Sequence, residues 1–392
     1  MRDLISLQKS YLILLIIPLI FLAVYLLTPT INGTDSYYFI NHICFSTEID
    51  APILSNLIFS LLSCDFTAFK LLLFASLLFC VLIIAFTGRL FSQKYGFLAG
   101  FFAFAGTNLP LGILNTFEDD ILAYPILFLA QYFFIKGLIK NNLKDKLVGI
   151  ALVLISLLFW KGSIIYLIPM GLTSLIAFIP LMGTLVVLGS YEFAMVVFPV
   201  LFHKVQVLEN LPLIAAAVWG FLLIGLIEIK RIKEKPFVSF GLIFIGMALL
   251  NAKFAIHAIP FLAIATMLLF ERLAESNKIK EGNKAVFLLG MTCFIIVYSA
   301  TALFQTMPTQ DTWNAIDYAI EQSELIGKPV KGDWSIGYFL EFKGLDVNGV
   351  KSGVKEQNYS NSIAIVFNEI EVKEFNCMQL KKFDGIKIFD CN

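Results

Sequence analysis

Long apolar stretches recur along this chain from Tyr11 to about Thr301. Each is close to the roughly 20 residues that a helix needs to cross the hydrocarbon core of a bilayer. Of the 392 residues, 58% are hydrophobic and only 15% are charged, whereas about a quarter of the residues of soluble domains are charged. We therefore expect an α-helical polytopic membrane protein. The chain becomes polar near Gln305, which predicts a transmembrane domain over 1–304 and a second domain over 305–392.

The connections between the stretches differ in charge, and this difference predicts the orientation. Basic connections alternate with connections that are short or acidic. Because Lys and Arg are retained on the cytoplasmic side, we expect a cytoplasmic N-terminus and an extracytoplasmic C-terminal domain in the cell membrane. The basic connections lie near 89–94, 136–146, 230–235 and 272–284, and the acidic ones contain Asp35, Glu48, Asp50 and Asp65, then Glu118, Asp119 and Asp120.

About eleven spans satisfy these constraints, and the first is expected to be retained because it lacks a small-residue cleavage site. The count is open over 147–202, where an error of two spans would preserve the orientation. The expected spans are 11–29, 68–87, 95–115, 121–136, 147–160, 163–180, 182–202, 211–229, 237–252, 256–271 and 285–303.

Six cysteines are divided by the expected membrane. Cys80 and Cys293 fall inside spans, where packing roles are expected. The other four fall outside, where oxidation is possible, so Cys44 with Cys64 and Cys377 with Cys391 are plausible pairs. No cysteine spacing is typical of a zinc site, and for His42, His203 and His257 we expect surface or packing roles.

Two acidic clusters are expected at the same extracytoplasmic interface, Gly33–Tyr38 after the first span and Thr116–Asp120 after the third. Their carboxylates could converge on one divalent cation, because hard cations prefer oxygen ligands. The alternative is that each acid is simply solvated. Glu192, inside an apolar stretch, is a further candidate if it is embedded in the membrane. Lys161 and Lys253 either snorkel at span ends or supply a cation for a phosphate.

Several segments together resemble the catalytic subunit family of oligosaccharyltransferases, a branch of the GT-C membrane glycosyltransferases. Asp35-Ser36-Tyr37-Tyr38 is similar to the family's first acidic motif, and Glu118-Asp119-Asp120 to its second, in which two acids separated by one residue precede a helix. Further matches, in the same order along the chain, are Trp160-Lys161-Gly162, Val207-Leu208-Glu209-Asn210, Lys253-Phe254 and His257-Ala258-Ile259-Pro260. Asp333-Trp334-Ser335-Ile336-Gly337 aligns with the family's WWDYG segment, but Asp333 replaces the first Trp and Ser335 replaces the Asp.

The resemblance implies an inverting enzyme that transfers sugar from a polyprenyl-linked donor to a protein, lipid or glycan acceptor, with membrane lipid and no nucleic acid as partners. It implies that Asp35, Glu118, Asp120 and Glu209 are catalytic and hold a divalent cation, Mg or Mn. It implies substrate-binding roles for Tyr38, Lys161, Lys253, Trp334 and Tyr338. The alternatives are an enzyme that moves a single sugar from polyprenyl phosphate to a lipid or glycan, and a non-catalytic assembly subunit or transporter.

The C-terminal domain is predicted to be a small α/β unit. Trp313, Ile316 and Ile320 recur at helical spacing in 311–326. Residues 362–367 and 385–389 are rich in Ile, Val and Phe, which predicts strands. A second helix is expected over 371–383, between these strands.

Overall fold

The computed structural model describes part of the chain, and every statement below concerns that part. It comprises residues 19, 22–23, 25–26, 34–45, 52–62, 64–105, 109–114, 117, 119–167, 169–171, 244, 255–275, 310–332, 334–345, 359–366, 376–383 and 386–392. Within these ranges the protein is mostly helical and carries a small C-terminal sheet, as the sequence predicts.

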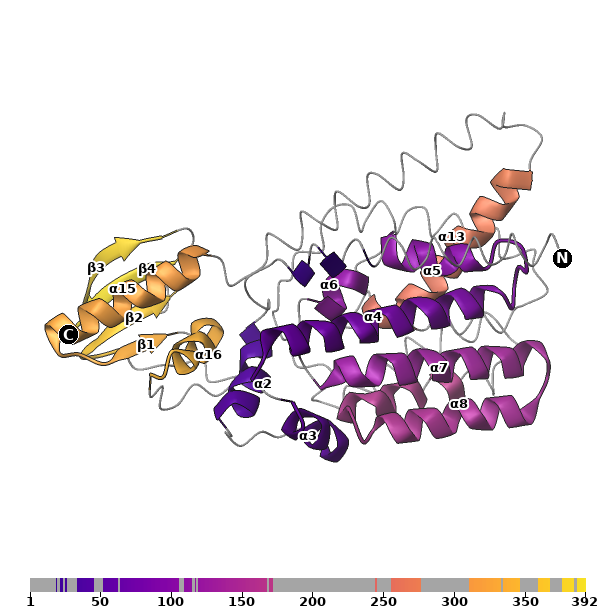
Figure 1. The fold of residues 1–392 in the computed structure, drawn as a ribbon, viewed down its shortest axis with the longest axis horizontal. Helices are drawn as coiled ribbons and strands as arrows, with labels where there is room; N and C mark the ends of the chain where they lie inside the picture. The colour runs from indigo at the N-terminus through magenta and orange to yellow at the C-terminus, as the bar shows by residue number, and fades with distance from the viewer. Residues whose placement is uncertain are drawn as a thin grey trace.

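The helical part is built around α4 (Phe66–Gly88), α7 (Asp120–Ile139), α8 (Leu143–Ser156) and α13 (Ala255–Glu275) (Figure 1). Two helices in the described ranges are long and apolar enough to cross a membrane, namely α4 with 23 residues and a mean hydropathy of 2.7, and α7 with 20 residues and 1.6. The expected helices at 68–87, 121–136 and 256–271 are therefore confirmed as helices.

The other expected spans are described in part or not at all. Within 95–115 there are two helical segments, α5 (Phe97–Ala105) and α6 (Leu109–Leu114), and in place of a span over 147–160 the structure has α8, which ends at Ser156. A short 3₁₀ helix, η1 (Lys161–Tyr166), follows. The spans 182–202, 211–229 and 285–303, almost all of 237–252, and most of 11–29 and 163–180 lie outside the described residues.

Small residues allow neighbouring helices to approach closely. A Cβ atom on Gly100 of α5 would lie 2.7 Å from the carbonyl oxygen of Val81 on α4. A Cβ on Gly149 of α8 would lie 2.8 Å from the carbonyl oxygen of Ala130 on α7. Interfaces between helices in membranes are typically enriched in such residues, because backbones then gain van der Waals contact.

The two basic connections that the structure describes in full, near 89–94 and 136–146, lie at one end of the helical part (Figure 1). Asn141 has a φ of 49° in the tight turn between α7 and α8, and Lys136 pairs with Asp145 across that turn at 3.1 Å. At the same end, Ser92 after α4 donates a hydrogen bond to Glu271 near the end of α13, 2.8 Å away. The directions of α4, α7, α8 and α13 therefore agree with the predicted alternation of basic and acidic connections. Which side of the membrane each end faces stays a prediction.

The C-terminal part is an α/β unit, as predicted. Its sheet has the order β1-β2-β4-β3, with β1 (Val330–Gly332) parallel to β2 (Ser362–Val366), and with β4 (Lys387–Cys391) antiparallel to both β2 and β3 (Cys377–Lys382). The helices are α15 (Gln310–Ile326) and α16 (Trp334–Phe342). The helix predicted at 311–326 and the strands predicted near 362–367 and 385–389 are confirmed. The predicted boundary near Gln305 lies outside the described residues.

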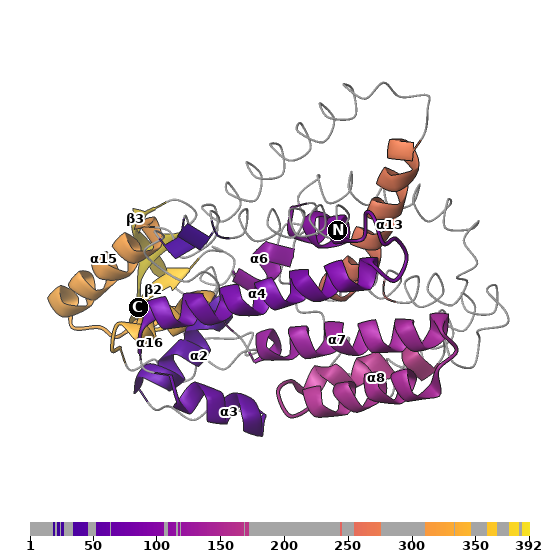
Figure 2. The same cartoon turned by 45° about the vertical axis from the view of Figure 1, so that its right-hand side comes forward.

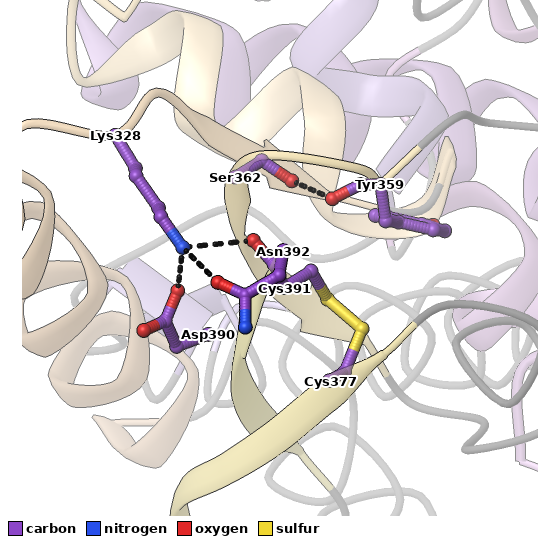
Figure 3. Close-up of a disulfide and its surroundings, with 7 residues drawn as sticks. All are labelled: Lys328, Tyr359, Ser362, Cys377, Asp390, Cys391 and Asn392. Carbon is purple, nitrogen blue, oxygen red and sulfur yellow. Dashed lines mark hydrogen bonds and ion pairs between the residues drawn. A yellow bond between two sulfur atoms is a disulfide. The ribbon is translucent and has the colours of Figure 1, made fainter.

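The helix predicted over 371–383 is wrong for its described part, because residues 377–382 form β3. This strand pairs with β4 from Cys377 opposite Cys391 to Lys382 opposite Lys387. A disulfide joins Cys377 to Cys391 at the start of the pairing (Figure 3). Pairing with β4 over the whole length of the segment therefore overrides its local pattern, as strand formation commonly depends on tertiary context.

β2 is one of the two inner strands of the tail-domain sheet and is buried on both faces. Ile363 and Ile365 join a core with α15 and α16, whereas Ala364 and Val366 face a second, smaller cluster with Phe389. Because both faces of β2 are buried, its apolar residues follow one another instead of alternating with polar residues. The end of the sheet is fixed by Lys328, whose ammonium contacts Asp390, the carbonyl oxygen of Cys391 and the side chain of Asn392 (Figure 3).

Both described disulfides match the pairs considered from the sequence. Cys44 at the end of α2 (Thr34–Phe45) is bonded to Cys64 just before α4, and the segment between them contains α3 (Ile53–Ser60). Cys80 is buried in the core of the helical part, as expected of a packing residue. Cys293 lies outside the described residues.

Candidate functional site

The first acidic motif opens α2, which lies beside α16 of the tail domain and close to the start of α4 (Figure 1, Figure 2). Asp35 is in the first turn of this helix, although its side chain and that of Tyr38 are outside the described structure. The next residue, Ser36, is completely buried. The position of this motif is therefore fixed by the contacts of Ser36 and Tyr37.

A buried hydrogen bond joins the two acidic motifs. The backbone N–H of Phe117 donates to the Ser36 hydroxyl oxygen at 2.7 Å, across 81 residues of sequence. Asp35 precedes Ser36 and Glu118 follows Phe117, so each acid is one residue, or about 3.8 Å along the backbone, from a partner in this bond. The side chain of Glu118 lies outside the described residues. The bond thus brings Ser36 of the first motif to Phe117 of the second, while convergence of their carboxylates stays a prediction.

Phe117 holds this junction in an aromatic environment. Its ring centroid lies 4.9 Å from that of Phe69 on α4 and 5.4 Å from that of Phe59 on α3. The ring itself is almost completely buried. The second motif is therefore packed against the helical core immediately before its acids.

Asp120 is the buried acid of the second motif. It begins α7, where the helix dipole favours a carboxylate. The Tyr124 hydroxyl, one turn further along, donates to Asp120 Oδ2 at 2.5 Å. Asp119, immediately before the helix, is only half-buried. The hydrogen bond from Tyr124 thus holds the Asp120 carboxylate in a fixed orientation.

Tyr124 leads from Asp120 to a cluster of aromatic and imidazole rings. Its ring contacts those of Trp160 and His257 at centroid distances of 6.3 and 5.7 Å. Trp160 stacks on His257 at 5.6 Å with an interplanar angle of 23°. The Tyr166 hydroxyl lies 2.6 Å from His257 Nδ1. Residues from α7, the η1 segment and α13 therefore form one buried ring cluster beside Asp120, and His257 has the packing role expected of it.

Two other residues singled out from the sequence, Lys161 and Tyr338, differ in exposure. Lys161 is exposed at the first position of η1, directly after the stacked Trp160. Tyr338 is buried within α16 of the tail domain, and its carbonyl oxygen accepts a hydrogen bond from Asn41 of α2 at 3.0 Å. Trp334 is the first residue of α16, and its side chain is outside the described structure.

The tail domain docks onto α2 through Tyr37. This side chain is fully buried and belongs to the core of the tail domain, although it comes from the helical part. Its ring centroid lies 4.7 Å from Phe339, 5.2 Å from Phe342 and 5.9 Å from Trp313. Asn41, one turn further along α2, also donates to Glu341. The residues that anchor the tail domain are therefore two and six positions after Asp35.

Within the described ranges, no group of three His, Cys, Asp or Glu side chains is placed to hold a metal ion. The side chains of three of the four expected ligands, Asp35, Glu118 and Glu209, lie outside those ranges, as do Lys253, Glu192 and His203. Of the expected metal site, the structure therefore describes the Asp120 side chain and parts of the backbone of the two acidic motifs.

Sequence reasoning missed several buried residues at this end of the molecule. Lys70 is almost completely buried on α4, with its ammonium 5.5 Å from the ring centroid of Tyr25. A lysine inside an apolar run is a signal that could have identified it. Tyr124 follows Asp120 by four residues, a spacing that brings two side chains together on a helix. Tyr37 lies inside the quoted first motif, but its role depends on a domain far away in sequence.

No protein-family model matches the chain, and a search of curated proteins finds no similar sequence. The class of the protein therefore follows from its fold and composition. It is a mostly helical chain that contains two helices suited to crossing a membrane, with a small α/β domain docked beside two linked acidic motifs.

Proposed function

We propose that this protein is a multi-pass membrane glycosyltransferase of the GT-C type, which transfers sugar from a polyprenyl-linked donor to an acceptor outside the cytoplasm. The observation that carries the proposal is the buried hydrogen bond from Phe117 to Ser36. It brings together the two acidic motifs that resemble those of oligosaccharyltransferase catalytic subunits.

The proposal includes about eleven spans, a cytoplasmic N-terminus and an extracytoplasmic tail domain. It is supported by the separation of charge along the helical part. The basic turn with Lys136 and the loop with Lys94 lie at one end, whereas Asp120 and α2 lie at the other. Under the positive-inside rule the acidic end then faces outward, where a lipid-linked donor would present its sugar.

The chemistry needs groups that stabilise negative charge. When an acceptor oxygen or nitrogen attacks the anomeric carbon, the bond from that carbon to the donor phosphate breaks, its electron pair moves onto the phosphate, and the acceptor's proton passes to a carboxylate. Asp35, Glu118, Asp120 and Glu209 would hold a divalent cation, and their oxygens are the ligands that Mg or Mn prefers. Such a cation, when bound, would neutralise the leaving phosphate.

The residues of this chain have further roles in the proposal. Tyr124 would keep one oxygen of Asp120 oriented through its 2.5 Å hydrogen bond. Lys161 and Lys253 would attract the donor phosphate, and a carboxylate not engaged by the cation would orient the acceptor hydroxyl or amide. Tyr38 and Trp334 would contact substrate. Each of these roles can be tested separately by substitution.

A second candidate is transfer of a single sugar to a lipid or glycan, and one observation favours it. Tyr338 is buried in the tail domain, and its carbonyl oxygen is bound to Asn41, which fits packing better than contact with an acceptor. Asp333 and Ser335 also depart from the family's acceptor-recognition segment. The third candidate, an assembly subunit or transporter, has less support, because the described buried acid lies at a helix end beside the other acidic motif.

Mass spectrometry of cell-envelope glycans, glycolipids and glycoproteins tests the proposal. Cells lacking the protein should lose one glycoconjugate, and Asp35→Asn or Glu118→Gln should reproduce that loss with normal amounts of protein in the membrane. The matched control is Asp65→Asn, since Asp65 is an exposed acid that caps α4 by accepting from Thr67, and Asn caps equally well. Full transfer by both motif variants would refute the proposal.

A further inference from the structure

One face of α3 exposes a continuous stripe of large apolar side chains. Ile53, Leu57 and Leu61, the last immediately after the helix, are 77%, 55% and 78% exposed. They recur every four residues, so they lie within an arc of about 80° around the helix axis. Neither α3 nor this stripe contains a charged residue. No residue that the structure describes covers this surface.

The opposite face of α3 fixes the direction of the stripe. Ser55 donates to the carbonyl oxygen of Phe159 at 2.7 Å, and the backbone N–H of Leu54 donates to that of Leu158 at 3.1 Å. Phe59 is completely buried, with its ring 5.5 Å from Phe39. The Cys44–Cys64 disulfide closes the segment that carries the helix. The stripe is thus held outward by contacts at both ends of α3.

The surface beside α3 indicates what covers the apolar stripe. Leu158, to which α3 is bonded, is exposed and follows the exposed apolar residues Leu154 and Ile155 of α8. Exposed apolar side chains therefore lie at the end of α8, beside the backbone that contacts α3. A surface of this size without charges favours a hydrocarbon environment over water.

We infer that α3 is an interfacial helix whose Ile53, Leu57 and Leu61 insert among the lipids of the bilayer at the acidic end of the molecule. The occupant of this surface is lipid, and because α3 has no charge, neutral lipid suffices. The inference depends on insertion of the protein in a membrane and is independent of sugar transfer. Through the disulfide and α2, lipid contact at α3 would set the height of the Ser36–Phe117 junction above the membrane.

Quenching by brominated lipids tests this inference with the full-length protein. Leu57→Trp and Leu61→Trp would each be reconstituted in phosphatidylcholine vesicles, with and without bromine on the acyl chains. The emission of the added tryptophan is obtained by subtracting the emission of the parent protein from that of the variant. The matched control is Met378→Trp, since Met378 is also exposed but lies on β3 of the tail domain.

We expect bromine to remove most of the added emission of both α3 variants and to leave that of Met378→Trp unchanged. Unquenched emission from both α3 variants would overturn the inference. A red-shifted spectrum would then place the stripe in water, and a blue-shifted one would place it against a second copy of the chain.

Discussion

Substitution of Tyr37 by Ala should release the tail domain from α2. The Tyr37 ring is fully buried and lies within 6 Å, between centroids, of Phe339, Phe342 and Trp313. Truncation of a buried aromatic side chain typically costs about 3–5 kcal/mol, through lost burial and the cavity left behind. Because the ring belongs to one part of the molecule and its neighbours to the other, most of this loss should fall on docking rather than on the stability of either part.

Hydrogen–deuterium exchange measures this loss directly. At about 1.4 kcal/mol per tenfold change, the undocked population should rise on the order of 10²–10³-fold. Peptides covering α2 and α16 should therefore exchange faster, whereas peptides from α7 should not change. Phe45→Ala is the matched control, since Phe45 contacts Phe342 at 6.1 Å but is half-exposed, and a loss of about 0.5 kcal/mol or less is expected there.

The hydroxyl of Tyr37 provides a second test of the same interface. In the described structure it is buried and makes no hydrogen bond, so Tyr37→Phe should keep or slightly strengthen docking. Burial raises the pKa of the phenol above its ordinary value. Docking of the parent protein should therefore be fully present below about pH 10 and weaken as the pH rises above it, unlike docking of the Phe variant. Unchanged exchange in Tyr37→Ala would refute the reasoning.

Three further substitutions test the helical part and the tail domain. Tyr124→Phe removes the hydrogen bond to Asp120, which should cost about 1.5–3 kcal/mol in thermal unfolding and, under the proposed function, reduce sugar transfer. Gly100→Val forces a side chain into the α4–α5 contact, and overpacking should cost about 1–3 kcal/mol in a detergent melt. Replacement of Cys377 and Cys391 by Ser opens a loop with a sequence separation of 14, which should cost about 3 kcal/mol and accelerate exchange in β3 and β4.

Matched variants separate these effects from general damage. Tyr132→Phe changes a half-buried tyrosine on the same helix as Tyr124 and should alter stability by about 0.5 kcal/mol or less. Gly171→Ala adds a methyl group where no atom of the described residues lies within 4 Å, so its melt should equal that of the parent. If a control variant lost as much stability as the variant to which it is matched, the assigned contact would be contradicted. For the cysteine pair, α7 peptides provide the internal reference, and faster exchange there would contradict a local effect.

The sequence predicted the features that depend on composition and on charge. The apolar runs at α4 and α7 exceed the length of ordinary core helices, so their helical character was predictable without knowledge of their partners. The Cys44–Cys64 and Cys377–Cys391 pairs, which the expected side of each cysteine made plausible, are both present. These inferences need only the local sequence and the nature of the solvent.

The features that were missed depend on contacts between distant segments. Residues 377–382 become a strand because β4 lies beside them, and no local pattern specifies that partner. In the sequence, Tyr37 is part of an acidic motif. Its ring nevertheless packs in the core of the tail domain, which begins far along the chain. His257 lies within a predicted span, but its contacts with Tyr166 and Trp160 depend on how three helical segments pack.

The Ser36–Phe117 bond also bears on whether the acids form a site or are merely solvated. Solvated acids at the end of a span require no contact with other loops, and their neighbours can remain in water. Here the residue after Asp35 is fully buried, and its hydroxyl oxygen accepts from the residue before Glu118. Burial of a hydroxyl and a backbone N–H is unfavourable unless they are paired, so this buried hydrogen bond opposes separation of the motifs. The packing thus favours a state in which the two acidic motifs stay together, which is a requirement of a shared site and not of a solvated surface.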